Sequence, residues 1–113
     1  MNNKELIMAF YQEFFNEHII EAAEKYVRED YIQHNPGVGQ GREALMEAFA
    51  DKFIQNPEFS LKIEKMISEE DMIAVYLKNI DAEGNTRCRV VDIYRVHDGK
   101  LAEHWDVLQP CVK

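Results

Sequence analysis

The chain has 113 residues, with 21 acidic against 13 basic side chains and a formal net charge of −8. This length predicts a single domain, residues 1–113, with one hydrophobic core. The acidic balance, without any cluster of lysine and arginine, argues against binding to nucleic acid or to an anionic membrane surface. No apolar run approaches the roughly 20 residues of a spanning helix. The two cysteines have no CxxC spacing, so we expect reduced thiols and a cytoplasmic protein.

The first half of the chain has the periodicity of helices. Apolar residues recur at helical spacing over residues 3–17, and a second, short helix is predicted over 19–28. Residues 31–36 form a short, β-prone segment. The proline at its end disfavours a helical conformation of the residue before it. A glycine-containing loop follows, and a third helix is predicted over residues 42–55.

The second half of the chain changes to the period-2 alternation of strands. The pattern predicts strands over residues 59–64, 72–80, 86–97 and 101–108, and Asp98-Gly99 is a strong hairpin signal between the last two. Helices followed by antiparallel strands indicate an α+β domain. We expect a long curved sheet that wraps three helices and leaves a small-molecule pocket between them.

Three polar residues of the last two predicted strands are the acid/base candidates. Strand alternation gives Asp92 the same face as Val90 and Tyr94, and it gives His104 and Asp106 a shared face on the next strand. A carboxylic acid in apolar surroundings holds its proton more tightly, because the charged form is poorly solvated. We predict catalytic roles for Asp92, His104 and Asp106. The alternatives are a structural carboxylate at Asp92 and a solvated or interfacial pair at His104 and Asp106.

Further residues are candidates for the wall of this pocket. The predicted ligand-binding residues are His34, Asn35, Tyr11, Phe14, Tyr76 and Tyr94. For the aromatic residues the alternative is plain core packing. For His34 and Asn35 the alternative is a turn held by side-chain to backbone hydrogen bonds. Trp105 and Val107 share the opposite face of their strand, which predicts a sheet-to-sheet dimer contact, and the alternative for Trp105 is stacking on a ligand.

Two motifs resemble a known family. Tyr31-x-Gln33-His34-Asn35-Pro36 and Gly99-Lys100-Leu101-x-Glu103-His104-Trp105-Asp106, together with the order of elements, are similar to the SnoaL-like polyketide cyclases of the nuclear transport factor 2-like superfamily. The resemblance implies a cystatin-like, cone-shaped sheet of bent antiparallel strands packed against helices. It also implies a homodimer and chemistry without metal or cofactor. The fold alone does not fix the chemistry, because it hosts enzymes and proteins without enzyme activity.

The resemblance implies different roles in different branches of the superfamily. In polyketide cyclases a single acidic residue does the acid/base work of an aldol closure, and Asp92 is the best candidate here. In ketosteroid isomerases the position of Asp92 donates a hydrogen bond to the substrate oxyanion, but Asn35 stands where the general base would be. In limonene-type epoxide hydrolases Asp106 would activate water, with an arginine bridging two aspartates. Arg95 is predicted to face away from Asp92, so no arginine is assigned to that role.

Three hypotheses follow for the activity. The first is a cofactor-independent cyclase- or isomerase-like enzyme acting on a small, partly apolar carbonyl compound. The second is a non-catalytic protein that binds a small ligand, and the third is an epoxide hydrolase that uses Asp106. A metal site is not predicted, because the four histidines show neither an HExxH pattern nor paired cysteines.

Overall fold

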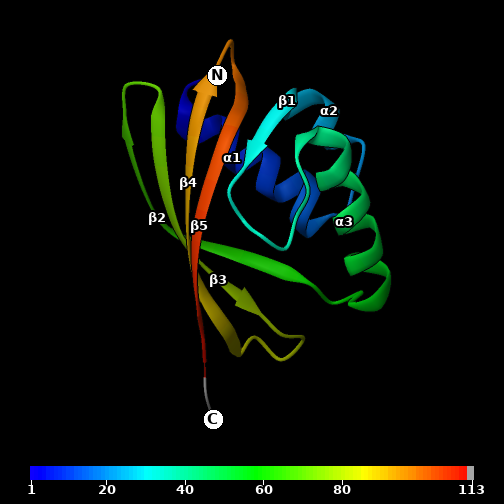
Figure 1. Ribbon diagram of the computed structural model, residues 1–113. Coiled ribbons are helices and arrows are strands. Elements are labelled where there is room, and N and C mark those ends of the chain that lie inside the picture. The colour runs from blue at the N-terminus through cyan, green and yellow to red at the C-terminus, as the bar shows by residue number, and fades with distance from the viewer. Residues whose placement is uncertain (112–113) are drawn as a thin grey trace.

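The computed structural model describes residues 1–111, and it shows helices followed by a five-stranded sheet (Figure 1). The helical segments are α1 (Asn3–Phe10), the π-helix η1 (Tyr11–Asn16), α2 (Ala22–Tyr26) and α3 (Gly41–Gln55). The strands are β1 (Val27–Gln33), β2 (Ser60–Glu69), β3 (Met72–Ile80), β4 (Thr86–His97) and β5 (Lys100–Pro110). The predicted α+β class is confirmed.

The strands lie in the order β1-β5-β4-β3-β2, and β2 to β5 form an antiparallel meander. β1 is the exception to the predicted antiparallel sheet, because it pairs with β5 in parallel, with Gln33 opposite His104. It also begins at Val27, inside the range predicted as the second helix. Val27, Tyr31 and Gln33 are buried, so packing against the core extends this strand beyond its local β propensity.

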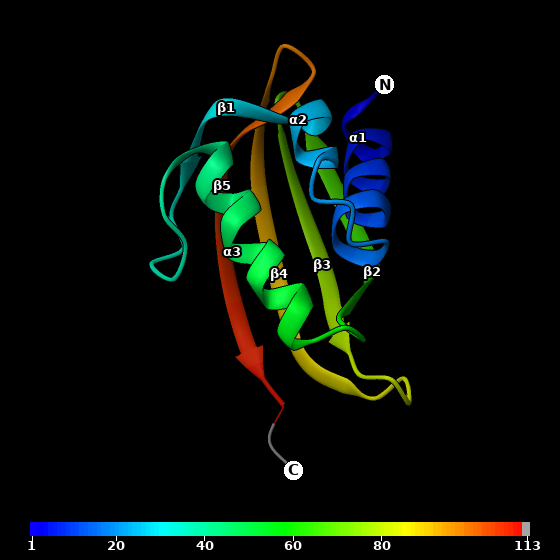
Figure 2. The same ribbon diagram turned by 90° about the vertical axis from the view of Figure 1, so that its right-hand side faces the viewer.

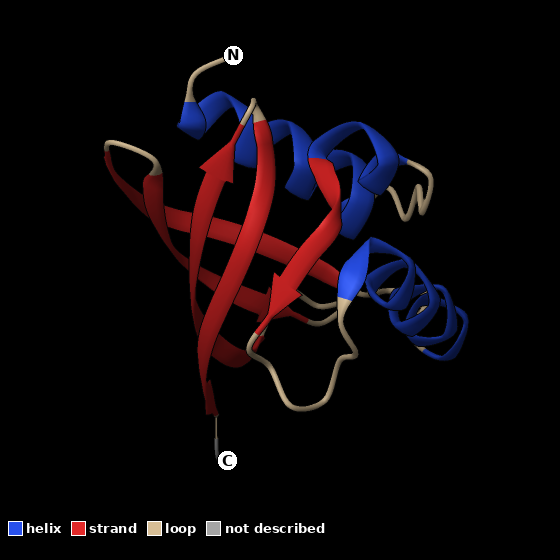
Figure 3. Cartoon of the chain, turned by 45° about the horizontal axis from the view of Figure 1, so that its top comes forward, coloured by secondary structure: helices blue, strands red, loops and turns tan. Residues whose placement is uncertain are grey.

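The helices cover one face of the curved sheet (Figure 2), and the strands bend around them (Figure 3). α1 begins with a capping box, in which the Asn2 side chain accepts from the backbone N–H of Glu5 and the Glu5 carboxylate accepts from that of Asn2. The helix then continues without a break into η1, so the predicted helix over 3–17 is one rod with a wider final section. None of the described helices is both long and apolar enough to cross a membrane.

Aromatic side chains from η1 and α3 fill the space between helices and sheet. The Phe14 ring stacks on Phe10 at 5.1 Å between centroids and meets Phe53 edge-on at 5.9 Å. Phe49 and Phe59 extend the same cluster. Phe14 is fully buried here and does not line the cavity described below, so its predicted place in the pocket wall is wrong. Its helical spacing reflects core packing.

The β4–β5 hairpin sets the register of the site. Asp98 and Gly99 form its turn with φ values of 51° and 74°, as an Asp-Gly hairpin turn requires. The register then shifts by one residue between Val96 and Arg95, and this shift places Asp92 directly opposite Asp106 and Tyr94 opposite His104. Paired residues in a ladder project from the same face, so all four side chains lie on the concave side, toward the helices.

Candidate functional site

A cavity of about 120 Å³ lies between the concave face of the sheet and the helices. One end is polar and the remainder of the wall is mostly aliphatic and aromatic. The lining residues are Phe10, Phe15, Tyr31, Gln33, Asn35, Val38, Leu45, Phe49, Lys52, Phe59, Leu61, Leu77, Asn79, Cys88, Val90, Asp92, Tyr94, His104, Asp106 and Leu108. The volume is of the same order as the roughly 150 Å³ cavity that takes up benzene in a well-studied protein.

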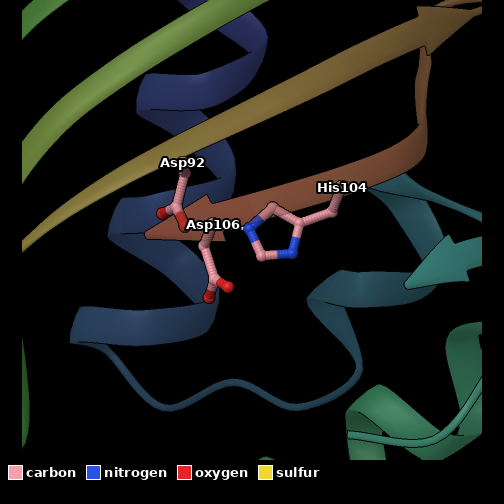
Figure 4. A group of neighbouring side chains, drawn as sticks. All are labelled: Asp92, His104 and Asp106. Carbon is pink, nitrogen blue, oxygen red and sulfur yellow. Dashed lines mark hydrogen bonds and ion pairs between the residues drawn. The ribbon is translucent and has the colours of Figure 1, made fainter. Parts of the chain in front are cut away.

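Asp92, His104 and Asp106 converge at the polar end of this cavity (Figure 4). One ligand atom from each lies within 4.8 Å of the other two. The His104 Nε2 atom is 2.8 Å from Oδ1 of Asp92, and both side chains are almost entirely buried. The structure therefore has two carboxylates and an imidazole together on one interior face, as predicted.

Gln33 on β1 determines where the His104 proton sits. Its Oε1 accepts a hydrogen bond from the backbone N–H of Asn35 at 3.2 Å, which identifies this atom as the carbonyl oxygen. The same oxygen is 2.7 Å from Nδ1 of His104, so Nδ1 must be the donor. Only one proton then fits between Nε2 of His104 and Asp92. The pair is either imidazolium with carboxylate or neutral imidazole with carboxylic acid.

Tyr11 and Tyr94 support Asp92 from the other side. The Tyr11 hydroxyl donates to Oδ2 of Asp92 and lies 2.8 Å from the Tyr94 hydroxyl. Because the single Tyr11 proton is used on Asp92, Tyr94 must donate to Tyr11. Burial first, and then the charge of Asp92, raises the pKa of both phenols well above 10.0. Both hydroxyls stay protonated and bind Asp92, directly or through each other.

Asp106 has a different environment. Its Oδ2 accepts a hydrogen bond from Nδ2 of Asn35 at 2.9 Å, while Oδ1 makes no hydrogen bond to another of residues 1–111. Asp106 also lines the cavity and is only partly buried. Both oxygens of Asp92 are occupied, by Tyr11 and His104. The carboxylate oxygen that is free to face a ligand therefore belongs to Asp106.

Tyr31 completes the polar end of the cavity. Its ring is nearly parallel to the His104 ring, 13° apart in plane, and the residue is 3% exposed. Burial, followed by the charges of Asp92 and Asp106, raises the pKa of its hydroxyl well above 10.0. No hydrogen bond within residues 1–111 engages this hydroxyl, so Tyr31 can donate its proton to a ligand oxygen.

Two predicted wall residues point out of the cavity. His34 lies on the outer side of β1's end, where its Nε2 is 2.7 Å from Oε2 of Glu103 and its ring stacks on Trp105 at 4.8 Å. Tyr76 faces outward from β3, paired with Val91 across the ladder. Neither residue lines the cavity, so these two predictions are wrong. Each lies next in sequence to a residue that faces inward, and side chains of adjacent strand residues point to opposite faces.

The other predicted wall residues lie at the site in different ways. Asn35 and Tyr94 line the cavity, whereas Tyr11 lies behind Asp92 and contacts the site through it.

Two residues of the site, Gln33 and Tyr31, were not predicted from the sequence, although both stand in the motif that carried the family resemblance. Their common face could have been read from alternation, since they are two residues apart. Alternation does not predict which strand lies next to β1. Gln33 reaches His104 because β1 pairs in parallel with β5.

The same three side chains could also hold a metal ion. Asp92, His104 and Asp106 offer two carboxylates and one imidazole, a donor set that suits several divalent ions. The sequence spacing did not suggest this, because the ligands come from two strands that only the fold brings together. That the protein acts without a bound metal ion stays a prediction.

Comparison with known proteins identifies the family. The model of the SnoaL-like polyketide cyclase family matches residues 5–110. The chain belongs to this family. No curated protein matches the chain by sequence.

Solved structures share the fold. TsrD from Streptomyces laurentii is 23% identical, with a TM-score of 0.76 over 93% of this chain and 86% of that one. Wild-type IdmH from Streptomyces antibioticus, described as a candidate polyketide cyclase, is 19% identical, with a TM-score of 0.77 over 96% and 92%. An NTF2-like protein of unknown function from Cytophaga hutchinsonii is 18% identical, with a TM-score of 0.78 over 97% and 92%. At these identities the likeness establishes the nuclear transport factor 2-like fold alone.

Proposed function

We propose that this SnoaL-like protein is a cofactor-independent acid/base enzyme that removes a proton from the carbon next to a carbonyl group in a small, partly apolar compound. One observation carries the proposal: Asp106, whose Oδ1 makes no hydrogen bond within residues 1–111, lines the same small cavity as Tyr31, whose hydroxyl is also without a hydrogen bond in that range. A base and a hydrogen-bond donor in one largely apolar cavity are the parts that enolisation needs.

Each polar group has a role in this proposal. Asp106 takes the proton from carbon, and the C–H electron pair moves into the enolate. The Tyr31 hydroxyl donates a hydrogen bond to the enolate oxygen. The enolate is then reprotonated or attacks a second carbonyl of the same molecule, and the alkoxide formed takes the proton from Asp106. Asp92 and His104 stabilise the changing charge. Nothing is oxidised or reduced, so no cofactor is required.

The structure changes which carboxylate we assign as the base. From the sequence Asp92 was the best candidate, yet its two oxygens are held by Tyr11 and His104. We therefore give the base role to Asp106 and a supporting role to Asp92. The epoxide-hydrolase alternative is not carried forward, because no arginine of the described chain lines the cavity and Arg95 pairs with Glu103 outside it.

The experiment is deuterium exchange into the methyl group of acetophenone in D2O, followed by proton NMR. We expect the protein to accelerate the loss of the methyl signal. Asp106→Asn should lower this rate about 100-fold or more, the usual contribution of a general base. Asp51→Asn, which changes an exposed carboxylate on α3, is the matched control and should leave it unchanged. Equal rates for Asp106→Asn and the parent protein would remove Asp106 from the mechanism.

Ligand binding without turnover is the second candidate function. The observation that favours it is Asn35, which stands where a general-base aspartate is found in related isomerases. Its side chain here donates to Asp106 and accepts from the backbone N–H of Gly37. In that case acetophenone would bind, and no exchange above the uncatalysed rate would be seen for the parent protein.

We also propose a homodimer through the outer face of the sheet. Strand pairing arranges two apolar rows there, with Ala74, Ile93 and Trp105 in one and Tyr76, Val91 and Val107 in the other. Val107 is 72% exposed in the single chain, so an apolar surface is left uncovered.

We also propose that the protein is cytoplasmic. Both cysteines are free thiols, which supports a reducing compartment.

A further inference from the structure

Three metal-ligating side chains meet at the polar end of the cavity (Figure 4). One carboxylate oxygen of Asp92, one of Asp106 and one ring nitrogen of His104 all lie within 4.8 Å of one another. Carboxylate oxygens and imidazole nitrogens are common ligands of divalent transition-metal ions. A metal ion that binds both Oδ1 of Asp92 and Nε2 of His104 displaces the single proton that these two atoms share.

Each of these side chains is already oriented for metal binding by a neighbour. Oε1 of Gln33 accepts from Nδ1 of His104 at 2.7 Å, so the lone pair of Nε2 is the one available to a metal ion. The second oxygens of Asp92 and Asp106 are held in a similar way, by the hydroxyl of Tyr11 and by an asparagine amide. Histidines and carboxylates that bind metals in proteins typically carry such outer hydrogen bonds, which fix the ligand atoms.

Charge also favours a divalent cation at this place. Asp92 and Asp106 stand directly opposite each other in the β4–β5 ladder, where two like charges repel. The remainder of the cavity wall is mostly apolar, so this repulsion is screened less than it would be in bulk water. The proton shared by Asp92 and His104 compensates one of the two carboxylates, whereas a divalent ion in its place compensates both.

The hydroxyl of Tyr31 is an independent sign of a ligand at this end of the cavity. Tyr31 is 3% exposed and lines the cavity, and its ring centroid lies 6.4 Å from that of His104. The hydroxyl makes no hydrogen bond within residues 1–111, although nearly all buried polar groups in proteins are paired. In that range only Oδ1 of Asn79 is both unpaired and sealed from solvent, so the Tyr31 hydroxyl is open to the cavity. A water molecule bound to a metal ion would supply its missing partner.

The spacing of two of the ligands selects the kind of ion. Oδ1 of Asp92 and Nε2 of His104 are 2.8 Å apart. Two metal–ligand bonds of about 2.1 Å span this distance at an angle of about 84°, close to the right angle of octahedral coordination. Tetrahedral coordination would need about 3.4 Å between the same two atoms. A six-coordinate ion therefore fits these two ligands without moving them, and water from the cavity can fill the positions that the protein leaves open.

We propose that Asp92, His104 and Asp106 form a binding site for one six-coordinate divalent transition-metal ion, such as Fe²⁺, Co²⁺ or Ni²⁺. The ligands are Oδ1 of each aspartate and Nε2 of the histidine, and water completes the coordination shell. This site goes beyond the proposed enolisation and does not depend on it. The two share one atom, because Oδ1 of Asp106 is the base in the metal-free protein and a ligand in the metal-loaded protein.

The first test is calorimetric titration of the protein, freed of metal with EDTA, with Ni²⁺ at neutral pH. We expect one ion to bind per chain. His104→Gln and Asp106→Asn each remove a ligand and should weaken binding at least about 100-fold, since loss of an outer-shell partner alone typically costs about 10–100-fold. His97→Gln and Asp51→Asn change exposed residues of the same two types, so these matched controls should bind Ni²⁺ like the parent protein.

A thermal scan shows whether the ion binds the folded protein. The melting temperature of the parent protein should rise with Ni²⁺ concentration, because a ligand of the folded state stabilises it. The rise should be lost in Asp106→Asn and kept in Asp51→Asn. Asp106 is only partly buried, so Asp106→Asn gives a folded variant for this comparison even where His104→Gln does not.

Two results would overturn the metal site. The first is the absence of Ni²⁺ binding to the parent protein. The second is binding that neither His104→Gln nor Asp106→Asn weakens, which would place the ion on the surface.

The metal site and the proposed enolisation fail separately. Ni²⁺ that fills the site should stop deuterium exchange into acetophenone, because it occupies the base. Exchange at an unchanged rate in the loaded protein refutes Asp106 as the base and leaves the metal site standing. Exchange by a parent protein that binds no Ni²⁺ refutes the metal site alone.

Discussion

Replacing Tyr11 by phenylalanine tests the hydrogen-bond chain that fixes Asp92. The substitution keeps the ring, which is 1% exposed and packed against Phe15 at 4.9 Å, and removes only the hydroxyl. It leaves two buried partners unpaired, Oδ2 of Asp92 and the hydroxyl of Tyr94. Each unpaired buried group costs about 1–3 kcal/mol, so we expect Tyr11→Phe to lower the free energy of unfolding by at least about 2 kcal/mol.

This loss is large for a domain of this size. Total stabilities of about 5–15 kcal/mol are usual, and each kcal/mol corresponds to roughly 4 °C in melting temperature for a chain of about 100 residues. Urea denaturation and a thermal scan would measure the effect. Tyr26→Phe is the control, because its hydroxyl makes a single, partly buried hydrogen bond to Glu13. Its loss should stay near about 1 kcal/mol.

A double-mutant cycle with Tyr94→Phe sharpens the test. Once Tyr94 has lost its hydroxyl, Tyr11→Phe no longer leaves an unpaired phenol behind. The double variant should therefore be more stable than the sum of the single effects predicts, by about 1 kcal/mol. Additive effects within about 0.3 kcal/mol, or a Tyr11→Phe loss no larger than that of Tyr26→Phe, would refute the assigned chain of hydrogen bonds.

Three further predictions concern alkaline stability, assembly and the hairpin. Burial raises the pKa of Tyr11, Tyr31 and Tyr94 above 10.0, so the folded protein keeps protons that the unfolded chain loses. The free energy of unfolding should be constant up to about pH 10 and then fall by as much as about 4 kcal/mol per pH unit. Urea titrations at pH 8 to 11 would measure this fall, and a free energy that does not change with pH would contradict the prediction. Val107→Lys should convert a dimer into a monomer in sedimentation experiments without slowing deuterium exchange, whereas an unchanged mass excludes this face. Gly99→Ala forces a φ of 74° on a residue with a Cβ and should cost about 1–2 kcal/mol in urea unfolding; no cost would mean that the turn relaxes.

The hairpin shows how much of the site the sequence could predict. Asp98-Gly99 specifies a tight turn, and the turn fixes the pairing of the residues next to it, His97 with Lys100 and Val96 with Leu101. Alternation groups His104 with Asp106, but the register continued from the turn would pair Asp92 with Trp105. Only the one-residue shift between Arg95 and Val96 places Asp92 on the face of His104 and Asp106. The α+β class followed from the change of period along the chain.

Roles within the site depended on contacts between segments far apart in sequence. Tyr11 comes from η1, 81 positions before Asp92, and its hydroxyl donates to Oδ2 of Asp92. Strand alternation alone had predicted that the Asp92 carboxyl group is free to bind a ligand. Gln33 reaches His104 only because β1 joins the sheet in parallel beside β5. The Tyr11 contact, with the His104 hydrogen bond, changed the proposed base from Asp92 to Asp106, and the Gln33 contact identified Nδ1 of His104 as a donor.

The sequence by itself therefore determined the α+β class, most of the elements and their order, the family resemblance, and which residues of one strand share a face, because these follow from local periodicity and turn signals. Tertiary structure decided which strands are neighbours, how deep each side chain lies and which polar atoms are already paired. Those properties depend on the packing of distant segments, and a period of two places His34 and Gln33 on opposite faces without saying which face holds the cavity.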